Sequence, residues 1–197
     1  MFILILLLAL NFGISWWNCY AVGRVWEETK AVGGFMRVLA WCGAIQSAIG
    51  FSSVIGAILG YIAFQLGYLP PPILKGAVSF WYVLVIIPCV STGLIITLES
   101  WNQWWRDRSL TNLGVAGWNT FAQVHNTVGM IQNFGPALDD VGDLFEALTS
   151  SDDAKAKLAG VAIFLVIAAL AGGILLTMVL IKKYSGSVAL PERSLAY

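Results

Sequence analysis

The clearest candidates for chemistry are the carboxylates of the segment Asp139-Asp140-Val141-Gly142-Asp143, which Glu146 follows closely. Carboxylate oxygens along one side of a helix are ligands that Mg²⁺ and Ca²⁺ accept. Asp139, Asp143 and Glu146 are therefore the candidates for a divalent-metal site, and with Asp140 they would define a small metal-dependent enzyme. The pattern occurs once, and a hydrated helix face explains the same residues without a metal. We therefore expect neither a metal nor another cofactor.

Histidine and cysteine add little catalytic potential. His125 is the only histidine, which excludes a metal site built from several imidazoles, and neither H-E-x-x-H nor G-x-S-x-G occurs. We interpret His125 as a hydrogen-bonding or capping group in a polar segment. Cys19 and Cys42 are expected at similar depth, where they are either free or joined by a disulfide, which requires an oxidising compartment and suitable geometry. Cys89 is interpreted as a small buried apolar residue.

The composition of the chain places these residues in a membrane protein. Of its 197 residues, 58% are hydrophobic and only 11% are charged, whereas soluble domains carry roughly 25% charged residues. Eleven basic and eleven acidic side chains cancel. The chain therefore lacks the basic surface of a nucleic-acid-binding protein, and no nucleic acid is expected as a partner. The expected surrounding is a lipid bilayer, in a membrane that the sequence does not specify.

Four continuous apolar segments, at 2–22, 38–66, 73–98 and 158–181, are each long enough to cross a hydrocarbon core of roughly 30 Å. They predict an all-α integral membrane protein with a four-helix transmembrane bundle. The prolines at 70–72 end the second segment, and Pro88 predicts a kink in the third. A cleaved signal peptide is the alternative for the first segment, although no basic residue precedes it and no A-x-A-like site follows it.

The chain accordingly divides into three linked spans at 1–98, a polar and amphipathic extramembrane loop at 99–157, a fourth span at 158–184 and a polar tail at 185–197. Within the loop, the pattern predicts a polar helix at 118–133 that stops before Gly135-Pro136, and then an amphipathic helical segment at 137–148. The apolar face of this segment is a predicted docking face for a partner. Its residues are Leu138, Val141, Leu144, Phe145 and Leu148.

Small residues recur along two of the spans. In the second span they lie four residues apart, and in the fourth they form two offset pairs, so both helices permit close approach of another helix. These rows either pack the chain's own helices or mediate oligomerisation with a second copy or another membrane chain. The residues are Ala48, Ser52, Gly56, Gly60, Ala168, Gly172, Ala169 and Gly173.

Asn11, Ser15 and Asn18 share one face of the first span. Polar side chains in lipid seek interhelical hydrogen bonds. The expected partners are Gln46 and Ser47 of the second span and Ser91 and Thr92 of the third. The other interpretation is that the three residues line a water-filled path through an oligomer.

No catalytic set emerges, and charged residues lie only at the ends of the predicted spans, which disfavours a proton-coupled carrier. We expect a non-enzymatic accessory or structural subunit that forms a homo-oligomer or a hetero-oligomeric membrane complex through its small-residue faces. The alternative hypotheses are an oligomeric pore or small-solute channel and a small divalent-metal-dependent membrane enzyme. With four spans, the flanking Lys and Arg residues divide between both sides and favour cytoplasmic polar loops only slightly.

Overall fold

The computed structural model describes residues 2–185, which form five α-helices and no strand. The helices are α1 (Phe2–Val32), α2 (Gly34–Gln65), α3 (Pro71–Arg106), α4 (Leu110–Leu148) and α5 (Asp153–Ser185). Four of them, α1, α2, α3 and α5, are long and apolar enough to cross a membrane. The predicted all-helical class and the presence of four long apolar helices are therefore confirmed. The predicted polar tail lies beyond the described residues, apart from its first residue.

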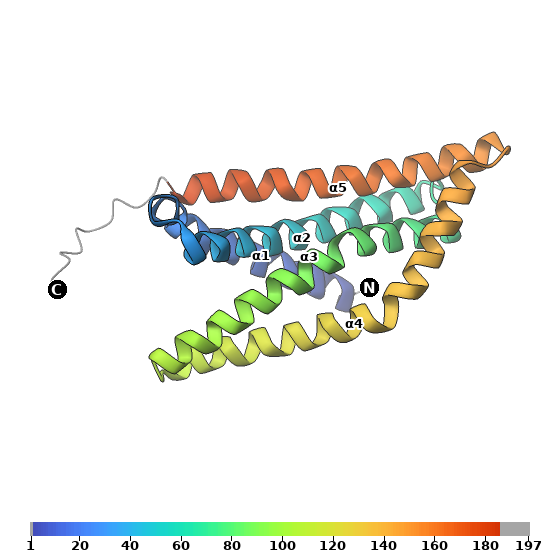
Figure 1. Cartoon of the computed structure of the whole chain (residues 1–197). Helices are drawn as coiled ribbons and strands as arrows, with labels where there is room; N and C mark the ends of the chain where they lie inside the picture. The colour runs from blue at the N-terminus through green and yellow to red at the C-terminus, as the bar shows by residue number, and fades with distance from the viewer. Residues whose placement is uncertain (1, 186–197) are drawn as a thin grey trace.

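Helices α1, α2 and α5 lie side by side, and α3 joins them through its first half (Figure 1). Two groups of buried apolar residues hold this bundle together. One joins α1, α2 and α5, and its members are Cys19, Val22, Ala40, Ala44, Phe51, Leu180 and Ile181. The other joins the ends of α2 and α4 to the beginnings of α3 and α5, and its members are Ala63, Leu69, Ile73, Ala77, Leu144, Ala147, Ala159, Ala162 and Val166.

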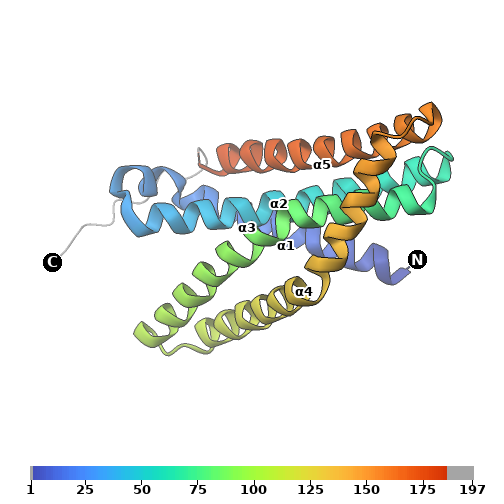
Figure 2. The same ribbon diagram turned by 45° about the vertical axis from the view of Figure 1, so that its right-hand side comes forward.

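The second half of α3 leaves the bundle together with the first half of α4, and the two helices form a long hairpin (Figures 1 and 2). Pro88 lies in the middle of α3, where it removes a backbone hydrogen bond and favours a bend. Ser109 caps the start of α4 by accepting a hydrogen bond from the amide of Asn112.

The region predicted as an extramembrane loop, 99–157, is helical almost throughout. Helix α3 continues through Glu99 to Arg106, and α4 does not stop before Gly135-Pro136 but continues to Leu148. A proline inside a helix costs one hydrogen bond without always ending the helix, and α4 changes direction in its second half instead (Figure 1). The two short helices predicted here are therefore one bent helix of 39 residues.

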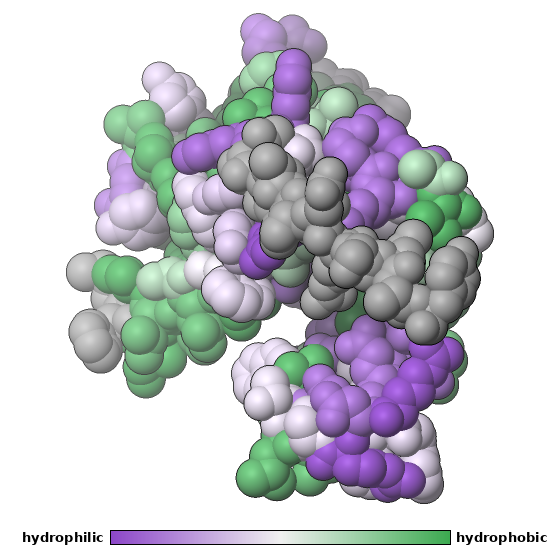
Figure 3. Space-filling view, turned by 90° about the vertical axis from the view of Figure 1, so that its left-hand side faces the viewer, coloured by the Kyte–Doolittle hydropathy of each residue, from purple (hydrophilic) through white to green (hydrophobic). Residues whose placement is uncertain are grey.

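The helix ends gather at two opposite ends of the molecule (Figures 1 and 2). The α1–α2 turn, the α3–α4 turn and the end of α5 lie at one end, which we call the basic end. The α2–α3 and α4–α5 turns lie at the other, the acidic end. Basic residues are in excess at the basic end, which carries Arg24, Lys30, Arg37, Arg106, Arg108, Lys182 and Lys183 beside Glu27, Glu28, Glu99 and Asp107. Acidic residues are in excess at the acidic end, which carries Asp139, Asp140, Asp143, Glu146, Asp152 and Asp153 beside Lys75, Lys155 and Lys157. Figure 3 faces the basic end and shows hydrophilic residues on the main bundle and on the hairpin tip.

Candidate functional site

A cluster of neutral polar side chains lies where α2, α3 and α4 meet, near the middle of each helix. Gln46 of α2 donates from Nε2 to the Cys89 carbonyl and to Thr92 Oγ1, both at 2.7 Å. Thr92 in turn donates to the carbonyl of Pro88 at 2.6 Å. Helix α2 is therefore fixed to the proline-containing part of α3 by a side-chain amide, as is expected of polar groups away from water.

Helix α4 approaches the same part of α3 with its own amides. Gln123 donates from Nε2 to the Val90 carbonyl at 3.0 Å, and Asn126 Nδ2 lies 3.5 Å from Cys89 Sγ. The other polar atom of the Gln123 amide, Oε1, is buried and accepts no hydrogen bond from the residues described. A buried acceptor without a partner is costly, so this atom calls for a water molecule or a ligand donor.

These amides border an open cavity of about 420 Å³ that lies between α1 and α2 on one side and α3 and α4 on the other, which we call the amide cavity. Its polar lining includes six neutral amide side chains and the carboxylate of Glu99, and apolar residues such as Val22, Leu39 and Ile96 complete the wall. A cavity of this size with this many polar groups is suited to water or a small polar solute. The six amide residues are Asn18, Gln46, Gln103, Asn119, Gln123 and Asn126.

The three residues predicted as a shared polar lining separate in the structure. Only Asn18 lines the amide cavity. Asn11 donates to Ser53 Oγ and lies 3.4 Å from the Gly50 carbonyl, and Ser15 is buried against Gly50. Asn11 and Ser15 therefore join α1 to α2, while Asn18 faces the cavity.

The small-residue rows lie against neighbouring helices of the same chain. A Cβ atom added at Gly173 would lie 2.5 Å from the Ala48 carbonyl oxygen and 2.7 Å from the Ser52 amide nitrogen, so α5 and α2 touch through their backbones here. The other rows make looser contacts: Gly56 faces Ala169, Gly60 faces Leu74, and Gly172 faces Ile55. Ala168 is half-buried on the same helix. These surfaces are occupied within the chain.

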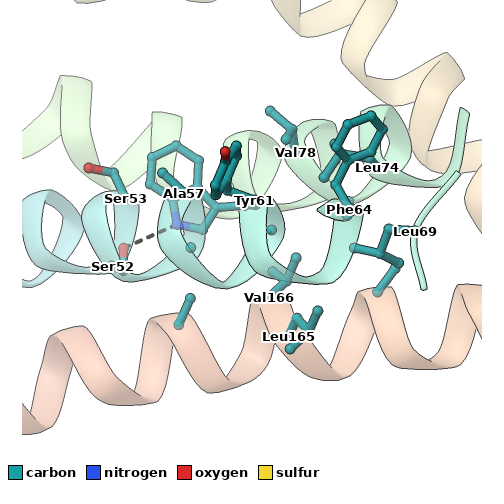
Figure 4. Close-up of a pocket in the computed structure, with 16 residues that line it drawn as sticks. Ser52, Ser53, Ala57, Tyr61, Phe64, Leu69, Leu74, Val78, Leu165 and Val166 are labelled. Atoms are coloured by element: carbon teal, nitrogen blue, oxygen red, sulfur yellow. Dashed lines mark hydrogen bonds between the residues drawn. The ribbon is translucent and has the colours of Figure 1, made fainter. Parts of the chain in front are cut away.

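A second, apolar cavity of about 360 Å³ opens between α2, α3 and α5, and Figure 4 shows its lining. Gly56, Ala57 and Gly60 leave the space, and Tyr61 and Phe64 border it. At one end the indole of Trp81 donates to Ser52 Oγ at 3.1 Å (Figure 4). Part of the predicted GxxxG row therefore borders a hollow rather than a tightly packed helix.

The predicted docking face at 138–148 is partly covered by the chain itself, although Leu138 and Phe145 remain 46% and 43% exposed. Leu144 is 2% exposed and packs with Leu148 against α3 and α5. Phe145 meets Phe80 edge-on, with ring centroids 5.8 Å apart. Val141 is half-buried, and Leu138 alone among the long side chains of this face stays well exposed without such a contact. The bend in α4 turns the face towards α3 and α5.

The acidic segment separates into one paired and several hydrated carboxylates. Asp140 accepts hydrogen bonds from Lys75 at 2.7 Å and from Ser79 at 2.8 Å. The Lys75 bond, followed by the Ser79 bond, lowers the pKa of Asp140 below its ordinary value. Asp139, Asp143 and Glu146 are exposed. Among residues 2–185, no three His, Cys, Asp or Glu side chains are grouped so that they could hold a metal ion.

The cysteines of the described chain are free thiols, so Cys19 and Cys42 are not bridged. Cys19 is fully buried between α1, α2 and α5. Neither residue belongs to a reactive site with a nearby base, and both serve as small core residues.

The outer surface of α4 carries a feature that sequence reasoning missed. His125 and Gln132 are exposed on this helix, and neither makes a hydrogen bond with the residues described. His125 only stacks on Phe121, with ring centroids 6.4 Å apart. It lies beside Gln123 and Asn126, which contact the middle of α3. The signal available in the sequence was the absence of any Asp, Glu, Lys or Arg between Arg108 and Asp139.

The four apolar helices indicate a multi-pass membrane protein. Comparison with protein-family models, with curated proteins and with solved structures found no match to this chain.

Proposed function

We propose that the protein is a non-enzymatic multi-pass membrane subunit that acts by assembling in the bilayer, and that α4 carries its assembly surface. The observation that carries this proposal is the exposure of His125, close to the Gln123 contact with the middle of α3, and of Gln132 two turns further along α4. Polar side chains that face lipid are costly and are normally paired. A partner helix would supply the missing hydrogen bonds.

The proposal requires α4 to cross the membrane, and its pairing with α3 supports this. Contacts between the two helices run along both, in opposite order, as expected for an antiparallel pair. If α3 spans the bilayer, α4 returns through the same thickness. The contacts are Lys75 with Asp140, Tyr82 with the Gly129 carbonyl, Gln123 with the Val90 carbonyl, Thr97 with the Asn119 carbonyl, and Trp101 with Thr120.

The distribution of side chains on α4 also fits a crossing helix. The polar side chains of Asn119, Gln123 and Asn126 face the rest of the chain, while Phe121 and Ile131 are exposed. Polar groups inside and apolar groups outside are what a lipid environment requires. Roughly 20 residues span a bilayer core, and the stretch without Asp, Glu, Lys or Arg between Arg108 and Asp139 exceeds that length.

If α4 crosses as well, the chain crosses the membrane five times. The Lys and Arg residues that flank the helices then gather mainly on one side instead of dividing between both. Lys182 and Lys183 now share an end with Arg24, Arg37 and the α3–α4 turn, whereas Lys75, Lys155 and Lys157 are the basic residues of the opposite end. At the basic end, Arg37 lies 3.9 Å from the centre of the Trp26 ring and Arg108 lies 3.9 Å from that of Trp105, a pairing suited to the headgroup region. The positive-inside rule then assigns the basic end to the cytoplasm.

Mild-detergent extraction followed by native mass measurement tests the proposal. We expect the tagged chain to leave the membrane as a homo-oligomer or with a second membrane protein. The double variant His125→Leu with Gln132→Leu should yield mainly the monomer, while the control Gln65→Leu, an exposed residue at the end of α2, should not change the mass. A strictly monomeric parent chain with no companion would refute the proposal.

A second candidate function is a path or binding place for a small polar solute, and the amide cavity is the observation that favours it. Purified protein in liposomes should then pass uncharged polar solutes, and the flux should fall in Asn18→Leu and Gln123→Leu. Asn133→Leu is the matched control, because Asn133 is exposed and absent from the cavity lining. Liposomes that stay impermeable with the parent chain would contradict this function.

A further inference from the structure

The exposed residues of α4 follow a seven-residue repeat. Two rows run along its outer surface, and every member is exposed. Within each row the residues are seven positions apart, and going from one row to the other and back takes three and then four positions. Rows at this spacing form the contact seam of two helices that wind around each other. The first row is Thr111, Trp118, His125 and Gln132, of which Trp118 also borders the mouth of the amide cavity, and the second is Gly114, Phe121, Val128 and Gly135.

From this pattern we infer that the partner of α4 is the α4 helix of a second copy of the chain, packed in parallel and in register along these two rows. The inference rests on the proposed function and names its partner. Copies in one membrane insert with the same orientation, so two α4 helices that meet along their whole length are parallel. In register, each residue of the seam then faces its own counterpart.

The polar residues of the seam suit such a self-pairing. A neutral imidazole has one N–H donor and one acceptor nitrogen, and a glutamine amide has both donor and acceptor atoms. Two facing His125 rings, and two facing Gln132 amides, can therefore bond to each other with no third group. A polar residue at one position of such a seam also fixes the register. Gly114 and Gly135 have no atom of the chain within 4 Å of an added Cβ, so they leave room for close approach near both ends of the seam.

A neighbouring row offers a competing seam. Gly117, Val124, Ile131 and Leu138 are also exposed and could pack together with the row of Phe121 and Val128. That seam is entirely apolar, but it would leave His125 and Gln132 facing lipid. Lipid already solvates apolar side chains, so covering the polar row lowers the free energy of the dimer more than covering the apolar row does.

Cysteine cross-linking in native membranes distinguishes these arrangements. Trp118→Cys and Phe121→Cys lie on the inferred seam, whereas Val124→Cys and Ile131→Cys are equally exposed controls on the neighbouring row. The native cysteines lie outside α4, and the parent chain provides the baseline. After oxidation with copper phenanthroline, we expect a disulfide-linked dimer of twice the chain mass for positions 118 and 121 and little for 124 and 131.

The outcomes separate the inference from the proposed function. Dimers at 124 and 131 without 118 would overturn the inferred seam and move the self-pairing to the neighbouring row. No dimer at any of the four positions would overturn the self-pairing, while a companion in the mass measurement would still support assembly. A cross-linked product with another protein would likewise replace the second copy by that partner. In addition, the double variant His125→Leu with Gln132→Leu should weaken dimerisation by roughly tenfold or more. Replacing His125→Leu by His125→Gln in that double variant should restore part of the lost dimerisation.

Discussion

Lys75 Nζ lies 2.7 Å from Asp140 Oδ1, and this ion pair joins two residues that are 65 positions apart in the chain. Lys75 stands in the first turns of α3, and Asp140 follows the proline in the second half of α4. The pair, together with the Ser79 bond to the same carboxylate, fastens the returning helix at the acidic end. It marks where α4 rejoins the bundle after the hairpin.

Removing this ion pair should have a small effect. Lys75 is 71% exposed in its side chain, and exposed ion pairs contribute about 0 to 1 kcal/mol. Asp140→Asn should therefore lower the thermal unfolding midpoint in detergent only slightly, because the asparagine can still accept the Ser79 bond. Asp139→Asn, at an exposed neighbour, should leave the midpoint unchanged. A large loss in Asp140→Asn alone would mean that the pair supports the whole hairpin.

The same pair has a defined pH dependence. Since the folded chain lowers the pKa of Asp140, the unfolded chain binds its proton more readily, and the carboxylate stabilises the fold above its unfolded pKa of about 3.9. That contribution should disappear as the pH falls through the lowered pKa. Unfolding midpoints of the parent and of Asp140→Asn should thus converge in acid, and a gap that widens below pH 4 would contradict this account.

Gly173 should tolerate no side chain. A Cβ there meets backbone atoms of Ala48 and Ser52, which cannot move aside as a flexible side chain would. We expect Gly173→Ala to destabilise the protein by about 1 to 3 kcal/mol, measured by denaturation in detergent. Gly142→Ala provides the opposite control, because nothing lies within 4 Å of its Cβ and alanine favours a helix. Equal stability of the two variants would refute the close contact between α2 and α5.

Gln46 should contribute measurably to the packing of α2 on α3. Gln46→Leu removes two hydrogen bonds at 2.7 Å, and hydrogen bonds between membrane helices contribute roughly 0.6 to 2 kcal/mol. Gln65→Leu, which changes the same residue type at an exposed site without a hydrogen bond among the residues described, is the matched control. A Gln46→Leu protein as stable as this control would show that water replaces the lost bonds.

The number of crossings can be tested directly with accessible cysteines. Single cysteines at Arg108, in the α3–α4 turn, and at Ser151, in the α4–α5 turn, should react with a membrane-impermeant thiol reagent from opposite sides of a sealed vesicle. Ser151→Cys should react from outside the cell and Arg108→Cys only after the membrane is opened. Labelling of both positions from the same side would contradict the crossing of α4.

The sequence predicts the four apolar helices because continuous apolar runs of membrane length have few other structures available. It does not reveal that α4 is one long helix that runs back along α3. Asn119, Gln123 and Asn126 give that helix a polar sequence, and only the fold brings them to the side that faces α3 and the amide cavity. The amide cavity was equally hidden, since Asn18 and Gln46 reach it from helices whose rotation the sequence does not define.

The docking prediction at 138–148 overlooked the cover that the chain itself supplies, for a related reason. A face that includes Leu144 and Phe145 must be covered, but the pattern does not tell whether the cover belongs to the same chain. Here α3 supplies Phe80 and α5 supplies part of the core. The rows of Gly56 and Gly173 carried the same ambiguity: a close contact inside the chain accounts for Gly173, whereas Gly56 borders the apolar cavity.

The hairpin of α3 and α4 has a consequence for how the protein is made. If α4 crosses the membrane as proposed, it is too polar to be inserted alone, because Gln123 and Asn126 would have to enter lipid unpaired. Helix α3 leaves the ribosome first and offers the Val90 carbonyl and Cys89 as their partners. The translocation channel would therefore release the two helices together, with α3 waiting at its lateral opening until α4 has been synthesised.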